Sequence, residues 1–443
     1  MDNLPPELLR RILLYLITEW DSIHDIHESV PLTIVEPFTF RHLFLTPMRL
    51  NIAKAYNYLT PPRLAHLRHV CFRIEFPAHD LYVSTNPEDD DDQIVFSKAI
   101  RKILGLLERA PPRDIPLISL KLLIWPSREH RIPWLELPAD WDRNIQDLSE
   151  ISFFRVELES HALVFAPASI NMMAGKMTRL KKVQWWLCDG EKVDIELRIR
   201  QRTEFAYTLR LLPRSIEQFE LKYVRKPPTD RTFQPQGIVP PDAASDILSR
   251  ELCHFSQRDG LREFSVDASV DCSILWPEPQ NPGSKPPTWP TLSWFHVELN
   301  DVLPSGEWMD IRDPEAEEDR FDGNWDLDDG PESEVPGDEY EKRFQSIHNL
   351  IHFERFALAT ARAASEMPKV KGLFVTHHSL AEMGVGFVTT GLENSCCLEF
   401  TGEPPPEPSE KIIDAWRKVV DLHGMEWNVN FTTWGGAYYF YDI

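Results

Sequence analysis

One hydrophobic pattern, apolar-x-x-apolar-x-apolar, occurs eight times along this chain. Its second and third apolar positions alternate with other residues, which is typical of a β-strand with one buried face. The pattern therefore predicts eight strands. Their apolar positions are Leu67-Val70-Phe72, Leu117-Leu120-Leu122, Leu148-Ile151-Phe153, Leu180-Val183-Trp185, Ile216-Phe219-Leu221, Leu261-Phe264-Val266, Leu292-Phe295-Val297 and Val370-Leu373-Val375.

Segments with helical periodicity separate several of these strands. They lie at 95–107, 161–177, 199–212, 242–257 and 344–359. Strands that alternate with helices predict an α/β fold in which most strands pair in parallel. The repeat favours an irregular leucine-rich-repeat-like solenoid or an open sheet. Its period is longer and less regular than that of leucine-rich repeats, and independent strands of an ordinary α/β sheet would give the same pattern.

The end of the chain has a different pattern. Phe387–Thr390 and Cys396–Phe400 flank a short loop with glycine and asparagine, which predicts a hairpin. Ser409–Leu422 has the spacing of an amphipathic helix, and a glycine follows it. Residues 429–439 predict a closing hairpin around two glycines. We expect residues 381–443 to form an antiparallel α+β cap, because an open sheet edge needs covering.

The net charge of −23 is concentrated in two acidic runs. Residues 310–341 hold fifteen Asp or Glu and two Arg, and residues 88–92 are all acidic. The first run predicts a disordered, solvent-exposed insertion. We therefore expect an N-terminal segment at 1–45, a repeat-like α/β body at 46–380 that contains the insertion, and the cap. The chain lacks the basic footprint of a nucleic-acid-binding protein.

The six cysteines are scattered and form no C-x-x-C pair. In a chain of this length they predict reduced thiols and an intracellular protein, cytoplasmic or nuclear. The apolar stretches are too short to span a membrane, and the N-terminus does not have the pattern of a signal peptide. We therefore expect no membrane association.

Few residues suggest chemistry. His348 and His352 would lie one helical turn apart, a spacing that can bind zinc, but Asn349 stands where a zincin has its general base. Asp322–Asp328 imitates a calcium loop without its glycine and its final glutamate. No phosphate-binding glycine loop or nucleophile motif is present. The sequence predicts no catalytic residue, no metal and no cofactor, and it predicts that His377-His378 ends a strand without an evident partner set.

The first residues predict an amphipathic helix. In LPPELLRRILLYL, at residues 4–16, prolines occupy the first turn, followed by a glutamate that complements the helix dipole. Leu8, Ile12 and Leu16 recur every four residues and give one apolar face. An ordinary helix packed on the body of the protein would have the same periodicity.

This opening resembles the F-box, a helical module that binds the adaptor of cullin-type ubiquitin ligases. Much of the chain is similar to a fungal family of F-box-type proteins with an α/β region, in the segments Val35–Leu50, Leu67–Pro77, Phe96–Ile103, Ala361–Pro368 and Ala415–Lys418. The resemblance implies contact with a Skp-type adaptor through Leu4, Pro5, Leu8, Ile12 and Leu16. Residues 17–34 depart from the family, because they are short and polar and lack its Val-(Ser/Cys)-x-x-Trp stretch.

Three functions follow as hypotheses. The first is a non-enzymatic interaction scaffold, an F-box substrate receptor that presents an unknown target protein to a ligase. The second is a stand-alone binding or structural protein with a decayed F-box. The third is a hydrolase with its site on strand-end loops and no recognisable motif. A convergent polar cluster in a deep pocket would favour the third.

Overall fold

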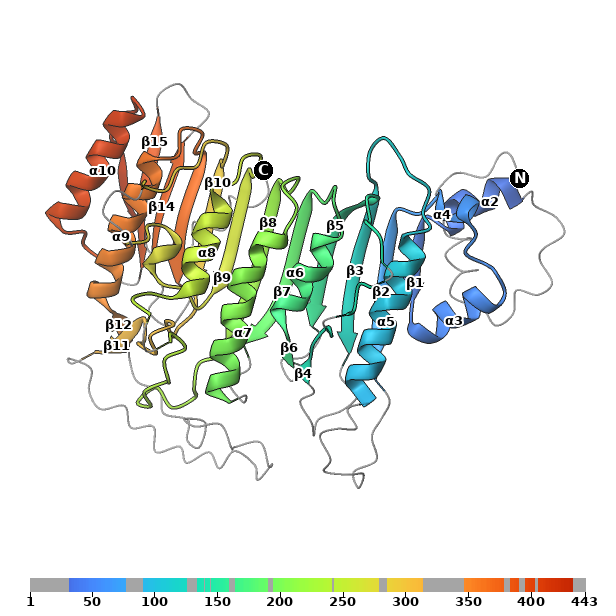
Figure 1. Ribbon diagram of the computed structural model, residues 1–443. Helices are drawn as coiled ribbons and strands as arrows, with labels where there is room; N and C mark the ends of the chain where they lie inside the picture. The colour runs from blue at the N-terminus through green and yellow to red at the C-terminus, as the bar shows by residue number, and fades with distance from the viewer. Residues whose placement is uncertain are drawn as a thin grey trace. The chain divides into compact units, whose positions relative to one another are not determined.

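The computed structural model describes residues 32–76, 91–125, 134–138, 140–143, 145–158, 164–189, 194–240, 243–278, 285–313, 346–377, 383–389, 395–402 and 405–432. The proposed adaptor-binding residues, within 4–16, lie outside the described residues, as does the calcium-like segment at 322–328. The F-box helix therefore stays a prediction. The described residues belong to two compact units of mixed α/β structure (Figure 1).

The first unit comprises the described residues within 1–128, 138–159 and 176–180. Its strands run in the order β1-β2-β3-β5 and pair in parallel. The strands are β1 His42–Leu45, β2 His69–Glu75, β3 Ile118–Trp125 and β5 Ile151–Leu158. The helices are α2 Leu32–Thr39, α3 Pro47–Ala55, α4 Pro61–Leu64 and α5 Asp91–Leu107.

The second unit comprises the described residues within 129–137, 160–175 and 181–443. Its main sheet has the order β7-β8-β9-β10-β13-β14-β15-β16. These strands are β7 Lys182–Asp189, β8 Gln218–Arg225, β9 Glu263–Ala268, β10 Trp294–Leu299, β13 Gly372–His377, β14 Met383–Thr389, β15 Cys396–Gly402 and β16 Val429–Thr432. Two small pairs accompany it, namely β4 Trp134–Leu135 with β6 Val164–Phe165, and β11 Asp310–Arg312 with β12 Ser346–His348.

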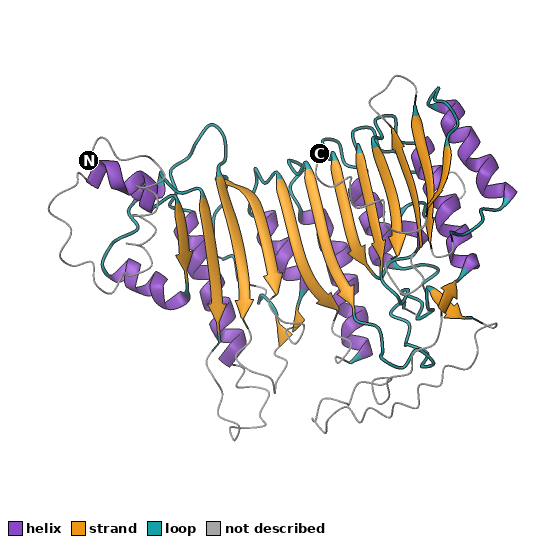
Figure 2. Ribbon diagram, turned by 180° about the vertical axis from the view of Figure 1, so that it is seen from behind, coloured by secondary structure: helices purple, strands orange, loops and turns teal. Residues whose placement is uncertain are grey.

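The helices of the second unit all lie on one face of its main sheet (Figure 1). They are α6 Pro167–Gly175, α7 Ile195–Thr208, α8 Ile247–Ser256, α9 Leu350–Ser365 and α10 Glu410–Leu422, with single 3-10 turns η2 Leu209–Leu211 and η3 Cys272–Ile274. Figure 2 shows the opposite face, where no described helix covers the strands. Right-handed β-α-β crossovers that return on the same side produce this arrangement.

All eight predicted strands form, as β2, β3, β5, β7, β8, β9, β10 and β13. The prediction of a mostly parallel sheet is also confirmed within each unit. In the second unit the middle apolar positions of the pattern pair directly, Phe219 with Phe264 and Phe264 with Phe295. Their ring centroids are 5.4 and 5.1 Å apart and all three side chains are buried. In these three strands the repeated pattern therefore marks one continuous row of aromatic side chains in the core.

The backbone repeats as well. In the second unit, the residue after the leading apolar position accepts two backbone N–H groups from the next repeat. The Lys181 carbonyl accepts from Glu217 at 2.8 Å and Gln218 at 3.1 Å, and the Glu217 carbonyl accepts from the equivalent pair before β9. The same arrangement recurs before β10 and β13. Each strand therefore starts at the same height as its neighbour.

Two positions of the pattern were assigned wrongly. Leu117 is 41% exposed, and the core position at this strand is the next residue, Ile118. In β5 the register shifts opposite Ile118/Ser119, so Phe154 instead of Phe153 pairs with Leu120 and is buried. A β-bulge inserts one residue and reverses the alternation beyond it, which a two-residue period cannot predict.

The cap is confirmed in part. β13, β14 and β15 pair antiparallel, as the predicted hairpin requires. Ser409 precedes α10, and Gly424, at φ +62°, follows it. The expectation of an antiparallel cap is wrong for β16, which pairs with β15 in parallel, and the second arm of the predicted closing hairpin lies outside the described residues. Helix α10 carries the chain back before β16 begins, and such a return gives parallel strands.

Two predicted features near α9 need correction. His348 lies in β12, not one helical turn before His352, because Asn349 caps α9 and its side chain accepts the Ile351 N–H at 3.2 Å. The acidic insertion was placed too early, since Asp310 belongs to β11 and is buried. Residues 314–341 of the insertion lie outside the described residues.

Candidate functional site

Charged residues collect at the carboxyl ends of the parallel strands in the second unit. Asp189, Arg225 and His377 are the last residues of β7, β8 and β13, and Asp301 follows β10 by two residues. All but Asp301 are buried. Ligands of open α/β sheets bind beyond this edge of the sheet, so it is the first place to look for a site.

Two buried ion pairs close the part of this edge near α7. Arg198 bonds Asp189 through two nitrogens, at 2.9 and 3.0 Å. Arg202 bonds Asp246 at 2.7 and 2.6 Å. Burial by itself would raise the pKa of Asp246, but Arg202 and the hydrogen bonds from Ser249 hold it below its ordinary value. These carboxylates stay charged and are occupied by their own arginines.

A second cluster joins the loops after β8 and β10 to the end of β13. Arg231 bonds Asp301 at 2.8 Å and lies 3.4 Å from Asp310. His377 contacts the same two carboxylates, with Nε2 3.1 Å from Asp301 and Nδ1 3.7 Å from Asp310. The expectation that His377 has no partner set was therefore wrong. Its partners lie more than sixty residues away in the sequence.

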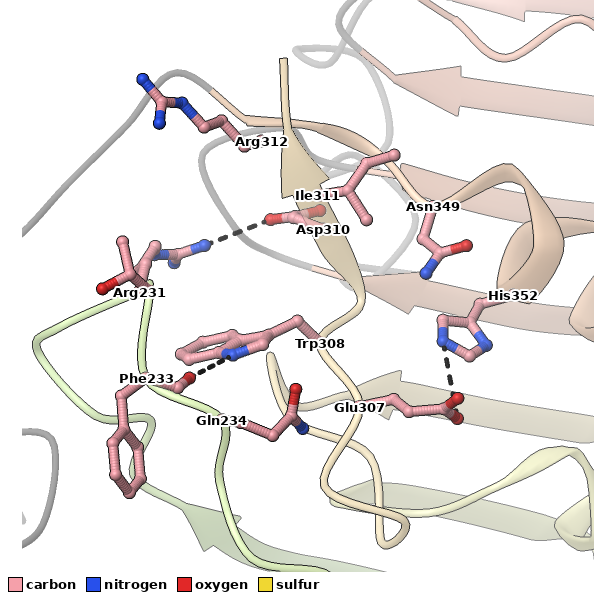
Figure 3. A pocket seen from close by; sticks show the side chains of 11 residues that line it. Arg231, Phe233, Gln234, Glu307, Trp308, Asp310, Ile311, Arg312, Asn349 and His352 are labelled. Carbon is pink, nitrogen blue, oxygen red and sulfur yellow. Dashed lines mark hydrogen bonds and ion pairs between the residues drawn. The ribbon is translucent and has the colours of Figure 1, made fainter. Parts of the chain in front are cut away.

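A hollow of about 350 Å³ lies beside this cluster (Figure 3). It is lined by the loop after β8, the segment from Glu307 to β11, and the start of α9. Trp308 forms one wall, with the Arg231 guanidinium 5.5 Å from its ring centroid and its indole N–H donated to the Phe233 carbonyl at 2.9 Å. His352 and Glu307 face each other at 3.9 Å on the far side.

The lining presents binding groups more than a reaction centre. Its one hydroxyl side chain is that of Thr232, and this Oγ1 is hydrogen-bonded to Asp230 at 2.6 Å. Within the described residues, no three His, Cys, Asp or Glu side chains are placed to hold a metal ion together. The described geometry therefore supplies a carboxylate, an imidazole and an aromatic wall, without a nucleophile beside a base.

The uncovered sheet face is the other candidate. Trp294 on β10 is 36% exposed and lies flat on β13, where a Cβ at Gly372 would come within 2.3 Å of its ring. Phe374 lies in the same way over Gly386 on β14. The two rings are parallel within 9°, with centroids 6.3 Å apart. We call Trp294 and Phe374 the aromatic plate; glycines below it let both rings rest on the backbone.

A row of side chains that includes three charged ones, Lys222, Asp267 and Glu298, crosses the sheet on the same face as the aromatic plate. The row runs Trp186, Lys222, Asp267, Glu298 and Thr376, each opposite the next. Lys222 bonds Asp267 at 3.0 Å. Burial, and then the charge of Asp267, raise the pKa of Glu298 to about 7, against 4.5 for a free glutamate. The uncovered face therefore has a carboxyl group that titrates near neutral pH.

The sequence indicated part of these two sites. The strand pattern placed Trp185 at a buried position, and by alternation its neighbour Trp186 points to the opposite face. It gave no signal for Glu298, Glu307 or Arg231, because their settings are made by segments far apart in the chain.

Comparisons with known proteins found nothing similar. No family model matches this chain, and neither a curated protein nor a solved structure gives a significant match. Among the described helices, none combines the length and the apolar content that crossing a bilayer requires. All six cysteines are free thiols.

We predict that Arg202→Met lowers the free energy of unfolding by about 3–5 kcal/mol, because it leaves the Asp246 carboxylate buried and unpaired. The matched control is Arg200→Met in the same helix, where the side chain is 61% exposed and a change within about 0.5 kcal/mol is expected. Urea unfolding of both variants measures the difference. Equal stability of the two would contradict the buried pair.

A second prediction concerns pH. The folded-state pKa of Glu298, about 7, lies above the 4.5 of the unfolded chain, so its contribution to stability is full below about pH 4.5 and is lost as the pH rises through about 7. The free energy of unfolding of Glu298→Gln relative to wild type should therefore rise by about 1 kcal/mol between about pH 5 and 8. This is less than the full pKa shift implies, because the group is partly solvated. Thermal unfolding across this range tests it, with the exposed Glu263→Gln as control. A constant difference between wild type and Glu298→Gln would disprove the titration.

Proposed function

We propose that this chain is a protein-interaction scaffold whose second unit binds a partner protein on its uncovered sheet face. The aromatic plate carries the proposal. Flat, partly exposed aromatic rings held rigidly on a sheet are typical anchors of protein interfaces, because they bury a large area at a low cost in side-chain entropy. A sheet face that no described helix covers leaves room for such a partner.

The chemistry of this face defines its partner. On the same face, Glu298 lies two residues along β10 from the partner of Phe374, Asp267 pairs with Glu298, and Glu220 lies farther away on β8; the cation among them, Lys222, is bonded to Asp267. We therefore propose an extended protein segment that lays a planar apolar side chain, aromatic or proline, on the plate and directs a basic side chain to the carboxylates. Charge complementarity of this kind sets specificity and association rate.

The finer fold hypothesis supports this view. The recurring hydrogen bonds before each strand and the single helical layer are features of solenoid proteins, which bind partners on their sheet side. We propose that the body is an irregular, leucine-rich-repeat-like relative of these architectures. Binding does not depend on this classification.

The ligase function is a separate part of the proposal. It is supported by the LPPELLRRILLYL opening, whose Leu4, Pro5, Leu8, Ile12 and Leu16 would contact a Skp-type adaptor. In that case the chain is an F-box substrate receptor, and the uncovered face holds the target. The alternative is a stand-alone binding protein with a decayed F-box. It differs from the first function only in that it binds no adaptor.

Selection of a random peptide library on the purified chain tests the uncovered face. We predict that enriched peptides combine an aromatic residue or proline with a basic residue, and that Trp294→Ala weakens their binding at least tenfold. Trp427→Ala is the control, since Trp427 is 39% exposed and lies outside the plate. Peptides that bind Trp294→Ala as well as wild type, or no enrichment at all, would refute the proposed surface.

Capture of a purified Skp-type adaptor tests the ligase function. Leu8→Glu should abolish capture, because burial of Leu8 in the contact is worth about 1.5–3 kcal/mol and the new charge would be unpaired there. The unfolding midpoint should stay close to wild type, and Trp294→Ala should still capture the adaptor. Unfolding by Leu8→Glu would make the helix an internal packing element, and no capture by wild type would leave the stand-alone binding protein.

A further inference from the structure

The hollow beside α9 is a second place where this chain can hold a ligand. Its residues come from three segments far apart in the sequence, Arg231–Gln234, Glu307–Arg312 and the start of α9. It lies beyond the carboxyl ends of parallel strands, where α/β proteins bind small ligands. A volume of about 350 Å³ is within the range of small-molecule pockets. None of its residues belongs to the aromatic plate.

His352 has unused hydrogen-bonding capacity toward this hollow. Its side chain is 4% exposed, yet neither ring nitrogen is hydrogen-bonded to a described residue. The Glu307 carboxylate, at 3.9 Å, is too far for a hydrogen bond. Burial lowers the pKa of His352 below 6.5; Glu307 opposes this shift and Arg355 adds to it, so the ring is neutral at pH 7 and one nitrogen can accept a hydrogen bond. Because the ring lines the hollow, a ligand there can use this capacity.

The other groups around the hollow accept hydrogen bonds or attract positive charge. The Glu307 side chain is 58% exposed and carries a carboxylate. Gln234 donates its amide N–H to the Gly306 carbonyl at 2.5 Å, which leaves its side-chain oxygen on the side of Trp308 (Figure 3). Trp308 already has one guanidinium over its ring, that of Arg231, so the ring suits cations.

The cations nearby do not favour an anionic ligand. Arg231 is bonded to Asp301 and lies 3.4 Å from Asp310, so its charge is balanced. Figure 3 shows the Arg312 guanidinium directed away from Glu307 and His352. A net charge of −23 on the whole chain adds long-range attraction for cations. An anion would meet the Glu307 carboxylate at the centre of the available groups.

We propose that this hollow binds an organic cation, a guanidinium or ammonium head group on a short chain. Glu307 supplies the opposite charge, His352 and the Gln234 oxygen accept N–H hydrogen bonds, and Trp308 packs on the aliphatic part. The same head group occurs on basic side chains of proteins and on free small amines, and both would use these contacts. The site stands independently of the proposed function.

Ligand-observed NMR titration of the full chain tests this site. The probes are Nα-acetyl-arginine methylamide, its neutral citrulline counterpart and agmatine. We expect binding of the arginine probe, of agmatine or of both, and at least tenfold weaker binding of the citrulline probe. Glu307→Gln should weaken the cationic probes at least tenfold, while the exposed carboxylate variant Glu410→Gln on α10 leaves them unchanged. His352→Gln should weaken them as well.

The outcomes separate the two sources of the head group. Binding of the arginine probe without agmatine assigns the site to a protein side chain, and the reverse assigns it to a free amine. Equal binding of the citrulline probe, or no effect of Glu307→Gln, overturns the proposal, as does the absence of binding by every probe. If His352→Gln fails to fold, Glu307→Gln still decides, because its side chain is largely exposed. Since Trp294→Ala leaves this hollow intact, failure here is distinguishable from failure of the uncovered face.

Discussion

A repeated backbone contact at the start of each strand organises the second unit. One carbonyl accepts two N–H groups of the following repeat, as that of Lys181 does from Glu217 and Gln218. The contact aligns neighbouring strands in height, so their apolar positions meet as a continuous row. The connections that contain helices return over the same face of the sheet, which buries that row beneath helices and leaves the opposite face without a described helix.

Both candidate sites follow from this arrangement. Side chains that alternate along a strand point to the core and to the uncovered face in turn, so Trp185 is buried while its neighbour Trp186 is exposed. The strand ends, aligned by the same register, bring charged residues of distant segments to one edge. The uncovered face offers a broad surface, and the edge offers a small open hollow. A planar partner suits the first, and a single head group suits the second.

The buried charges at the strand ends act mainly on conformational specificity, the choice of one packing arrangement over others. A buried ion pair repays its desolvation cost only with good geometry, and two-point bonding such as that between Arg202 and Asp246 provides it. Each pair joins a helix to a loop or a strand end, so a shifted packing would leave a charge unpaired. The pairs therefore favour one arrangement of α7, α8 and the loop after β9 over its neighbours.

The order of apolar and polar residues along the chain was sufficient to predict the strands, their parallel pairing and helix α10. These features depend on contacts within a few residues or on a period that repeats. The same alternation predicted the wrong core residue in β5, because a bulge places Phe154 instead of Phe153 opposite Leu120. It did not predict the direction of β16, which depends on the path of α10. Asn349, the cap that separates His348 from His352, was visible in the sequence as a residue that can begin a helix. The helical spacing of the apolar residues outweighed it in the prediction.

The tertiary structure alone decided where chemistry is possible. His377 had no partner in sequence because Asp301 lies 76 residues away, and the elevated pKa of Glu298 comes first from its burial and then from Asp267 on the neighbouring strand. The hollow around His352 needs three separate segments. Local patterns specify which residues form an element and which face is buried. Pairing of charges, burial of a carboxyl group and enclosure of a space depend on distances between elements, and these distances exist only once the strands are in register.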